Sequence, residues 1–191
     1  MSEKEIIVKI QYGDMNALGE LFEMYKNESF KYSYLITGDK YTSEDIVQET
    51  FITCYFHIKS LKNVEQFRSW FFKILTRIAW RYAKKQKKSV PVDNIFEKLQ
   101  NKNIDESIEK YIINQQSQML RTEIENLELK QRTVIILYYF NGLSVKEIAN
   151  IIGCFEGTVK SRLYSARKKL KCSLLVNSEE YKNSEIKGCG I

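Results

Sequence analysis

The scarcity of proline is the feature that most limits the fold of this chain, because proline interrupts helices and marks turns. Pro91 is the only proline among 191 residues, and long stretches carry apolar residues at spacings of three and four. That spacing places apolar side chains on one face of a helix, whereas the alternation typical of strands is missing. We therefore expect an all-α protein.

Capping residues predict three helices in the first half of the chain. Asp14 caps the first, which continues until Gly38 turns the chain. Thr42 and Asp45 form a capping-box pattern that begins the second. The third begins near Glu65 and ends in a basic run. The residues expected to face the core are Ala17, Leu18, Leu21, Phe22 and Tyr25 in the first helix, and Phe67, Trp70, Phe71, Ile74, Leu75 and Ile78 in the third.

A change of character after Lys88 divides the chain into two small helical domains, residues 1–88 and 105–172. Residues 89–104 are polar and weakly periodic, so we expect a flexible linker with room for one short helical turn. Residues 173–191 form a tail that we expect to be mobile. In the second domain one apolar face is expected from Ile108, Ile112, Leu120, Ile124 and Leu127, before a further helix over residues 130–140.

Composition excludes several classes of protein. The longest unbroken apolar run, Val134–Phe140, is too short to span a bilayer, and the first residues lack the order of a signal peptide. We expect a soluble, cytoplasmic protein without direct membrane insertion. The four cysteines stand far apart and His57 is the only histidine, so we expect no metal site, no cofactor and reduced thiols.

Charge is segregated along the chain. Residues 1–58 carry five basic and ten acidic side chains, whereas residues 59–88 carry ten basic and one acidic. A basic run of this kind is most simply a phosphate-binding patch with little base specificity.

The segment from Gly142 to Leu170 has the sequence pattern of a helix-turn-helix. Ser144 and Glu147 form a capping box, Gly153 gives the tight turn, and a further helix begins near Glu156. In that last helix Val159, Leu163, Ala166 and Leu170 are expected to face the core, opposite Gly157, Lys160, Ser161, Tyr164 and Lys168. No acidic residue lies between Gly157 and Ser178, so this helix can enter a major groove without repelling phosphate.

We assign different roles to the polar residues of this helix. A merely solvated amphipathic helix is the alternative, but charge, turn and capping signals agree on DNA reading. The candidates for base edges are Lys160, Ser161, Tyr164 and Ser165, and the candidates for phosphates are Arg162, Arg167, Lys168 and Lys169, with Thr158 completing the DNA-binding set.

These residues carry a resemblance to a known family. The stretch QRTVIILYYFNGLSVKEIANIIGCFEGTVKSRLYSARKKLK, residues 131–171, resembles region four of bacterial sigma factors of the extracytoplasmic-function group. In that family the second helix reads the minus-thirty-five promoter element. The proline often found ahead of Gln131 is replaced here by Glu128 and Leu129, a change that would let the preceding helix run on.

The first domain resembles sigma region two. Residues 43–88 begin with the pattern Asp-x-x-Gln-Glu-x-Phe, at Asp45, Gln48, Glu49 and Phe51. Helical spacing places Asp45, Gln48 and Glu49 on one exposed face, with Ile46, Thr50, Cys54 and Ile58 toward the interior. A solvated acidic face is the alternative. The resemblance implies that core RNA polymerase binds this face.

The same resemblance places the capture of minus-ten bases in the loop Ser60–Gln66. Asn63 is the best hydrogen-bonding candidate there, beside Lys62. Opening a promoter needs a platform for unstacked bases beside a cationic track, and no reacting side chain. The remaining candidates for this track are Phe67, Arg68, Lys73, Arg77, Arg81, Lys84 and Lys85.

We therefore expect a sigma factor that binds core RNA polymerase and promoter DNA, assists promoter melting and is not an enzyme. The resemblance also implies an anti-sigma factor as a partner. A plain transcription regulator, whose first domain only dimerises or senses, is the alternative from another class. A nuclease is disfavoured because neither a clustered acid set nor a phosphate-binding loop is recognisable.

Overall fold

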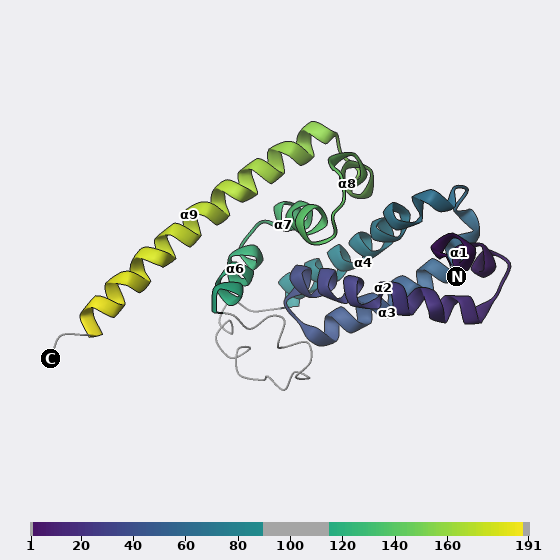
Figure 1. The fold of residues 1–191 in the computed structure, drawn as a ribbon, viewed down its shortest axis with the longest axis horizontal. Helices are drawn as coiled ribbons and strands as arrows, with labels where there is room; N and C mark the ends of the chain where they lie inside the picture. The colour runs from purple at the N-terminus through teal and green to yellow at the C-terminus, as the bar shows by residue number, and fades with distance from the viewer. Residues whose placement is uncertain (1, 90–114, 189–191) are drawn as a thin grey trace.

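The computed structural model describes residues 2–89 and 115–188, and every regular element in those residues is helical (Figure 1). The all-α prediction is confirmed. The first domain contains α1 (Glu3–Gln11), α2 (Met15–Thr37), α3 (Lys40–His57), the short 3-10 helices η1 (Ile58–Ser60) and η2 (Val64–Gln66), and α4 (Phe67–Ser89). The second contains α6 (Gln115–Glu125), α7 (Leu129–Ile135), the π-helical turn η4 (Ile136–Phe140), α8 (Val145–Ile152) and α9 (Glu156–Gly188).

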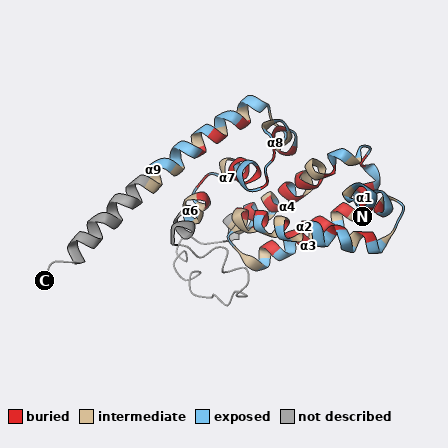
Figure 2. Ribbon diagram, in the orientation of Figure 1, coloured by how far each residue is buried: buried red, intermediate tan, exposed pale blue. Residues whose placement is uncertain are grey.

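Helices α2, α3 and α4 pack against one another around an aromatic core (Figures 1 and 2). The rings of Tyr25, Phe51 and Phe67 each lie 5.0–5.7 Å from the ring of Phe71, a separation at which aromatic pairs attract. Ala17, Leu21 and Tyr25 are buried as predicted, whereas Phe22 of the same stripe stays partly exposed.

The helix ends test the capping predictions. Asp14 caps α2 by accepting hydrogen bonds from the amides of Asn16 and Ala17, as expected. Gly38 ends that helix with φ of 72°, a left-handed conformation that glycine adopts without strain. The predicted capping box at Thr42 is wrong, because Asp39 caps α3 and accepts from the Thr42 amide at 2.7 Å.

Helix α1 was not predicted from the sequence. Ser2 and Glu5 form a capping box at its start, and Ile6, Ile7 and Ile10 are buried. The helix packs beside α2, η1 and η2. Its brevity and the two adjacent isoleucines obscured the periodic pattern.

The second domain places the helix-turn-helix as predicted. Ser144 and Glu147 form a capping box, and Gly153 ends α8 with φ of 69°. Val159, Leu163 and Ala166 of α9 are buried. The expectation that the helix before Glu128 would run on is wrong, because α6 ends at Glu125 and Glu128 lies just before α7.

Helix α9 continues beyond residue 172, where we expected the second domain to end, and reaches Gly188. No glycine or proline lies between Gly157 and Gly188 to stop it. The predicted linker apart from Ser89, which ends α4, lies outside the described residues, as do Ile108, Ile112 and the last three residues.

The two domains touch each other, and α4 packs against α8. Arg68 of α4 and Asn141, which follows η4, both bond to Glu28 of α2. Trp80 of α4 donates to the Thr133 hydroxyl of α7 at 2.8 Å.

Candidate nucleic-acid interface

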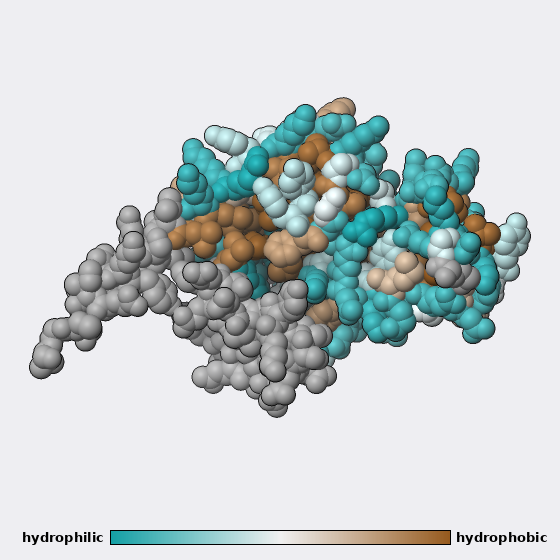
Figure 3. Space-filling model, viewed as in Figure 1, coloured by the Kyte–Doolittle hydropathy of each residue, from teal (hydrophilic) through white to brown (hydrophobic). Residues whose placement is uncertain are grey.

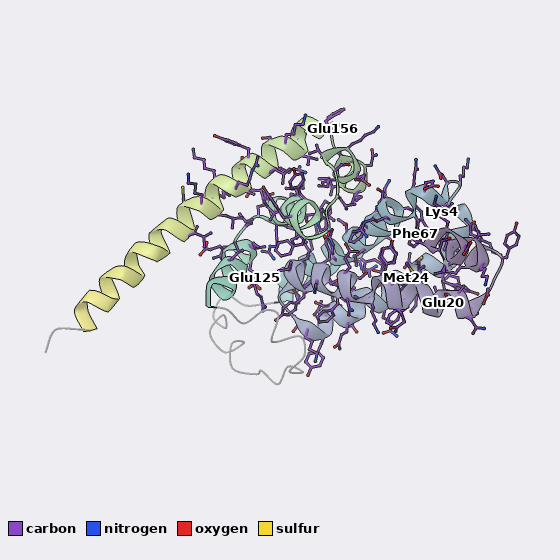
Figure 4. The ribbon with its side chains drawn as sticks, viewed as in Figure 1. Lys4, Glu20, Met24, Phe67, Glu125 and Glu156 are labelled. Carbon is purple, nitrogen blue, oxygen red and sulfur yellow. The ribbon has the colours of Figure 1, made fainter. Side chains whose placement is uncertain are left out.

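Helix α9 presents a polar face opposite its buried side (Figure 2). Lys160, Ser161 and Lys168 are exposed, and Tyr164 is 64% exposed. Because Val159, Leu163 and Ala166 anchor the helix, the exposed residues are displayed on a rigid support. Figure 4 shows Glu156 at the outer start of this helix, beside α8.

The other predicted residues of α9 are also at the surface. Arg167 is exposed, whereas Thr158, Arg162 and Ser165 are half-buried. Arg162 lies close to Cys154 in the turn, with its guanidinium 3.9 Å from the sulfur. Lys169 is exposed as well, so the nine predicted DNA-binding residues of this domain lie on one stretch of α9 and none of them is fully buried.

A second basic surface lies along helix α4. Arg77, Lys84 and Lys85 are exposed and Lys73 is half-buried. Three of them, at positions 73, 77 and 84, share one helix face. Positive charge therefore gathers along this face of α4.

Two arginines predicted to belong to the cationic track are engaged by carboxylates. Arg81 bonds to Glu49 of α3, and this hydrogen bond raises the pKa of its guanidinium. Arg68 makes a two-pronged pair with Glu28 and donates to the Asn141 carbonyl at 2.9 Å. Burial lowers the pKa of Arg68, but Glu28 outweighs this effect and leaves the pKa above its ordinary value. The carboxylates offset the positive charge of both arginines, so each pair must open before the arginine adds its full charge to the track.

Phe67 requires a correction. The sequence assigned it both to the core-facing stripe of its helix and to DNA binding, but its side chain, labelled in Figure 4, is fully buried, so only the first assignment holds. Its ring lies 5.5 Å from that of Tyr25 and 5.9 Å from that of Trp70. Phe67 is therefore a core residue, since the first position of α4 faces inward.

The loop from Ser60 to Gln66 displays Lys62 and Asn63 at its tip. Both side chains are exposed, while Leu61 anchors the loop by burial. The Asn63 side chain accepts the Glu65 amide at 2.9 Å, which caps η2 and leaves its amide nitrogen for other partners. Sequence reasoning missed Gln11, which holds this loop from α1 and carried no motif that would reveal it.

Only part of the acidic face of α3 is exposed and available to a partner protein. Asp45 and Gln48 are exposed, and Ile46, Thr50, Cys54 and Ile58 are buried as predicted. Glu49 also accepts from the Tyr82 hydroxyl at 3.2 Å. Thus α3 presents Asp45 and Gln48 outward while Glu49 ties it to α4.

An apolar groove of about 800 Å³ lies between α2 and α3, and sequence reasoning missed it. Gln48 lines it, together with large apolar side chains. Met15, Ile52 and Phe56 of this lining are each at least half exposed. Contiguous exposed apolar surface of this kind indicates a docking site for another protein.

The described residues contain neither a membrane-spanning helix nor a metal-binding cluster. Over residues 2–89 and 115–188, no helix is both long and apolar enough to cross a membrane. Within the same ranges, no cluster of three or more His, Cys, Asp or Glu residues is arranged to hold a metal ion.

Comparison with known proteins identifies the two domains. The Sigma-70 region 2 family model matches residues 21–89, and the Sigma-70 region 4 family model matches residues 117–170. RNA polymerase sigma factor SigV of Bacillus subtilis is 30% identical over 154 residues, which cover 78% of this chain and 86% of SigV. ECF RNA polymerase sigma factor SigW of the same organism is 29% identical over 182 residues, covering 91% of this chain and 97% of SigW.

Solved structures agree on the fold. CnrH, in complex with the cytosolic domain of CnrY, aligns with a TM-score of 0.69 at 18% identity, over 91% of this chain and 97% of CnrH. The sigma factor RpoE of Bartonella quintana, in complex with the anti-sigma factor NepR, aligns with a TM-score of 0.63 at 23% identity, over 83% of this chain and 96% of RpoE. The chain belongs to the extracytoplasmic-function group of the sigma-70 family, and is a promoter-recognising sigma factor of transcription initiation.

Proposed function

We propose that α9 reads the minus-thirty-five element, and that the Ser60–Gln66 loop with α4 binds and helps to open the minus-ten element, while core RNA polymerase holds both domains. The observation that carries this proposal is the exposed polar face of α9 around Lys160, Ser161 and Tyr164, opposite a buried apolar side. A helix so anchored fits the major groove, where side chains distinguish base pairs.

At the minus-thirty-five element the roles divide by side-chain chemistry. Lys160, Ser161, Tyr164 and Ser165 are the residues that we assign to base edges. Arg162, Arg167, Lys168 and Lys169 are assigned to phosphates, which position the helix without reading sequence, and Thr158 completes the DNA-binding set. Loss of a base contact should therefore alter promoter choice, and loss of a phosphate contact should weaken all promoters alike.

At the minus-ten element the protein performs no covalent chemistry. Asn63 offers a hydrogen-bonding side chain to an extruded base, and Lys62 lies beside it. Lys73, Arg77, Lys84 and Lys85 supply the cationic track, which Arg68 and Arg81 join when they leave Glu28 and Glu49. The energy for unstacking comes from holding the separated strand, so we assign no enzymatic activity to the chain.

We assign the outer face of α3 and the adjoining α2–α3 groove to core RNA polymerase. Asp45 and Gln48 supply polar contacts, and Ile52 and Phe56 supply exposed apolar ones. A polar rim around an apolar centre is the common composition of protein interfaces. An anti-sigma factor is the expected regulator, because the sigma factor RpoE of Bartonella quintana, which has the same fold, has been solved in complex with the anti-sigma factor NepR. We place the protein in the cytoplasm, where polymerase acts.

Run-off transcription with purified core polymerase tests the reading helix. Lys160→Ala with Ser161→Ala should reduce initiation about tenfold or more, because base contacts contribute about 1–3 kcal/mol each. Association with core polymerase should stay unchanged. Lys130→Ala, an exposed change on α7, is the matched control. Equal loss of transcription and polymerase binding would count against α9 as the reading helix.

A second pair of substitutions tests the proposed polymerase-binding surface. Asp45→Ala with Gln48→Ala should weaken association with core polymerase while leaving the thermal midpoint of the free protein in place. These two residues are better targets than Glu49, whose removal would also release Arg81. The control is Asn16→Ala with Glu20→Ala, exposed on α2 outside the groove. Undiminished association would rule out this face.

A further inference from the structure

The loop that we assign to base capture is held from outside by α1. Gln11, the last residue of that helix, donates from its side-chain amide to the carbonyls of Ile58 at 3.0 Å and Leu61 at 2.9 Å. A glutamine amide has two N–H donors, and both are used here. The two carbonyls lie just before the exposed Lys62 and Asn63.

Helix α1 is itself firmly placed. Ile6, Ile7 and Ile10 are each no more than 3% exposed. Glu3 accepts from the Tyr25 hydroxyl at 3.1 Å, and the exposed pair of Lys4 with Glu65 of η2, at 2.5 Å, adds little to this. Figure 1 shows α1 at the end of the first domain, and it contacts both η1 and η2. Gln11 thus reaches the loop from a rigid support.

The other bonds of the loop are local or lie after its tip. The Leu61 amide donates to Ile58, the Glu65 amide to the Asn63 side chain and the Gln66 amide to Asn63, and Glu65 pairs with Lys4 at the surface. Burial of Leu61 fixes where the loop is anchored, but not the direction of the backbone that follows it. The two Gln11 bonds tie that backbone to α1.

We propose that Gln11 is a positioning residue for promoter opening, which orients the Lys62–Asn63 tip toward the minus-ten base through the carbonyls of Ile58 and Leu61. This inference rests on the proposed function of the loop. It extends the minus-ten site to a helix that precedes the matched region 2 segment.

The test uses the full-length protein bound to core polymerase and a promoter carrying 2-aminopurine in the minus-ten element, whose fluorescence rises when the base unstacks. Gln11→Met keeps the length of the side chain but removes both donors, so we expect opening to slow about tenfold. Gln11→Glu keeps the shape and turns acceptors toward two carbonyls, so its loss should be larger. A purely steric role predicts the reverse order, with the isosteric Glu variant the milder.

Polymerase affinity and binding to a minus-thirty-five duplex should not change in either variant. Lys4→Met, which breaks the exposed pair with Glu65, is the matched control on α1 and should change opening less than twofold. Asn63→Ala separates this inference from the function on which it rests. If Asn63→Ala slows opening and the Gln11 variants do not, Gln11 has no positioning role. If Asn63→Ala opens normally, the loop assignment fails and this inference fails with it.

Discussion

Cys54 lies on the inward face of α3, where its side chain is fully buried among apolar neighbours. Burial raises the pKa of the Cys54 thiol to about 12. The thiolate is the reactive form of cysteine, so this thiol should be inert in the folded protein. Cys172 on α9 is exposed, which provides a contrast within the same chain.

We therefore expect Cys54 to react with a thiol reagent only when the first domain unfolds. In a variant with Cys154, Cys172 and Cys189 replaced by serine, labelling at pH 8 should be about 100-fold slower or more in buffer than in denaturant. A variant retaining only Cys172 should label quickly under both conditions. Rapid labelling of Cys54 in buffer would show that this core opens readily.

Single residues also show what the sequence can and cannot reveal. Exposure of Asp45 and Gln48 followed from helical spacing, because their neighbours Ile46 and Thr50 had to face inward. The pairing of Glu49 with Arg81 did not, because it joins side chains 32 positions apart and depends on how α3 packs against α4. Burial of Phe67, by contrast, was predicted by the apolar stripe of its helix, and only its second assignment, to DNA binding, was wrong.

At the scale of elements, the start of α8 depends on two side chains. The Ser144 hydroxyl accepts the Glu147 amide at 3.3 Å, and the Glu147 carboxylate accepts the Ser144 amide at 2.8 Å. These bonds satisfy amides that the first turn of a helix leaves free. They also fix where α8 begins relative to α9.

Ser144→Ala should lower the free energy of unfolding of the second domain by about 1 kcal/mol, the usual effect of losing a serine cap. Thermal denaturation followed by circular dichroism measures this change. Ser173→Ala, a change in the body of α9, should have a much smaller effect. If the two substitutions lower the free energy of unfolding equally, the Ser144 cap does not contribute to the stability of the second domain.

The same cap predicts a dependence on pH. The Ser144 hydroxyl bond is the largest influence on Glu147 and holds the pKa of its carboxyl below the ordinary value. A carboxyl with a lowered folded-state pKa stabilises the fold above its unfolded pKa of about 4.3, and this contribution disappears as the pH falls through the folded pKa. Glu147→Gln should therefore flatten the acid limb of the stability profile, measured by denaturant titration between about pH 5 and pH 2. If Glu147→Gln has the same loss of stability at low pH as the unchanged protein, the Glu147 carboxylate does not stabilise the start of α8.

Elements differ in how well the sequence foretold them. The helix-turn-helix was predictable because a capping box, a glycine turn and an apolar stripe agree along 29 consecutive residues, 142–170. Helix α1 was not, because its nine residues rely on contacts with α2 and η2 rather than on a long periodic stripe. The α2–α3 groove could not be foreseen either, since its lining comes from two helices.

At the scale of the whole molecule, polar contacts mark the boundary between the two domains. Glu28, Arg68 and Asn141 form a cluster across it, with the Asn141 amide donating to Glu28 at 3.0 Å. Arg132 donates to the Ile36 carbonyl at 2.7 Å nearby. Within the described chain, Asn141 Oδ1 and Arg132 Nε are buried and lack a hydrogen-bond partner. Such unsatisfied groups oppose tight closure, because water would hydrogen-bond to them once the domains separate.

With α9 on the minus-thirty-five element and the Ser60–Gln66 loop on the minus-ten element, as we propose, the length of promoter DNA requires this separation. The minus-ten and minus-thirty-five elements lie about 85 Å apart, because 25 base pairs each rise about 3.4 Å. Helices in contact lie about 8–10 Å apart, so α9, which packs on α8, lies within about 20 Å of the part of α4 that α8 covers. Even with the length of α4, about 35 Å, the closed arrangement cannot reach both elements.

Binding to core polymerase and promoter should therefore move the two domains apart. Resonance energy transfer between two dyes measures the distance between the domains. One dye is attached to Cys172 and the other to an introduced Glu20→Cys, in a protein that also carries Cys154→Ser and Cys189→Ser. The buried Cys54 stays unlabelled. Figure 3 shows the closed molecule as one continuous body on the viewed face over the described residues, and transfer should be higher in this state than in the promoter complex.

Substitutions in the cluster of Glu28, Arg68 and Asn141 test its role in the free protein, without polymerase. Glu28→Gln with Asn141→Ala removes the charge and the amide that join the domains, so transfer in the free protein should fall. Glu23→Gln makes the same chemical change on the same helix, in a pair with Lys26 that stays within α2, and should leave transfer unchanged. Transfer that stays constant from free protein to promoter complex would contradict the separation. A fall on promoter binding without any effect of the double variant would show that contacts other than this cluster hold the domains together.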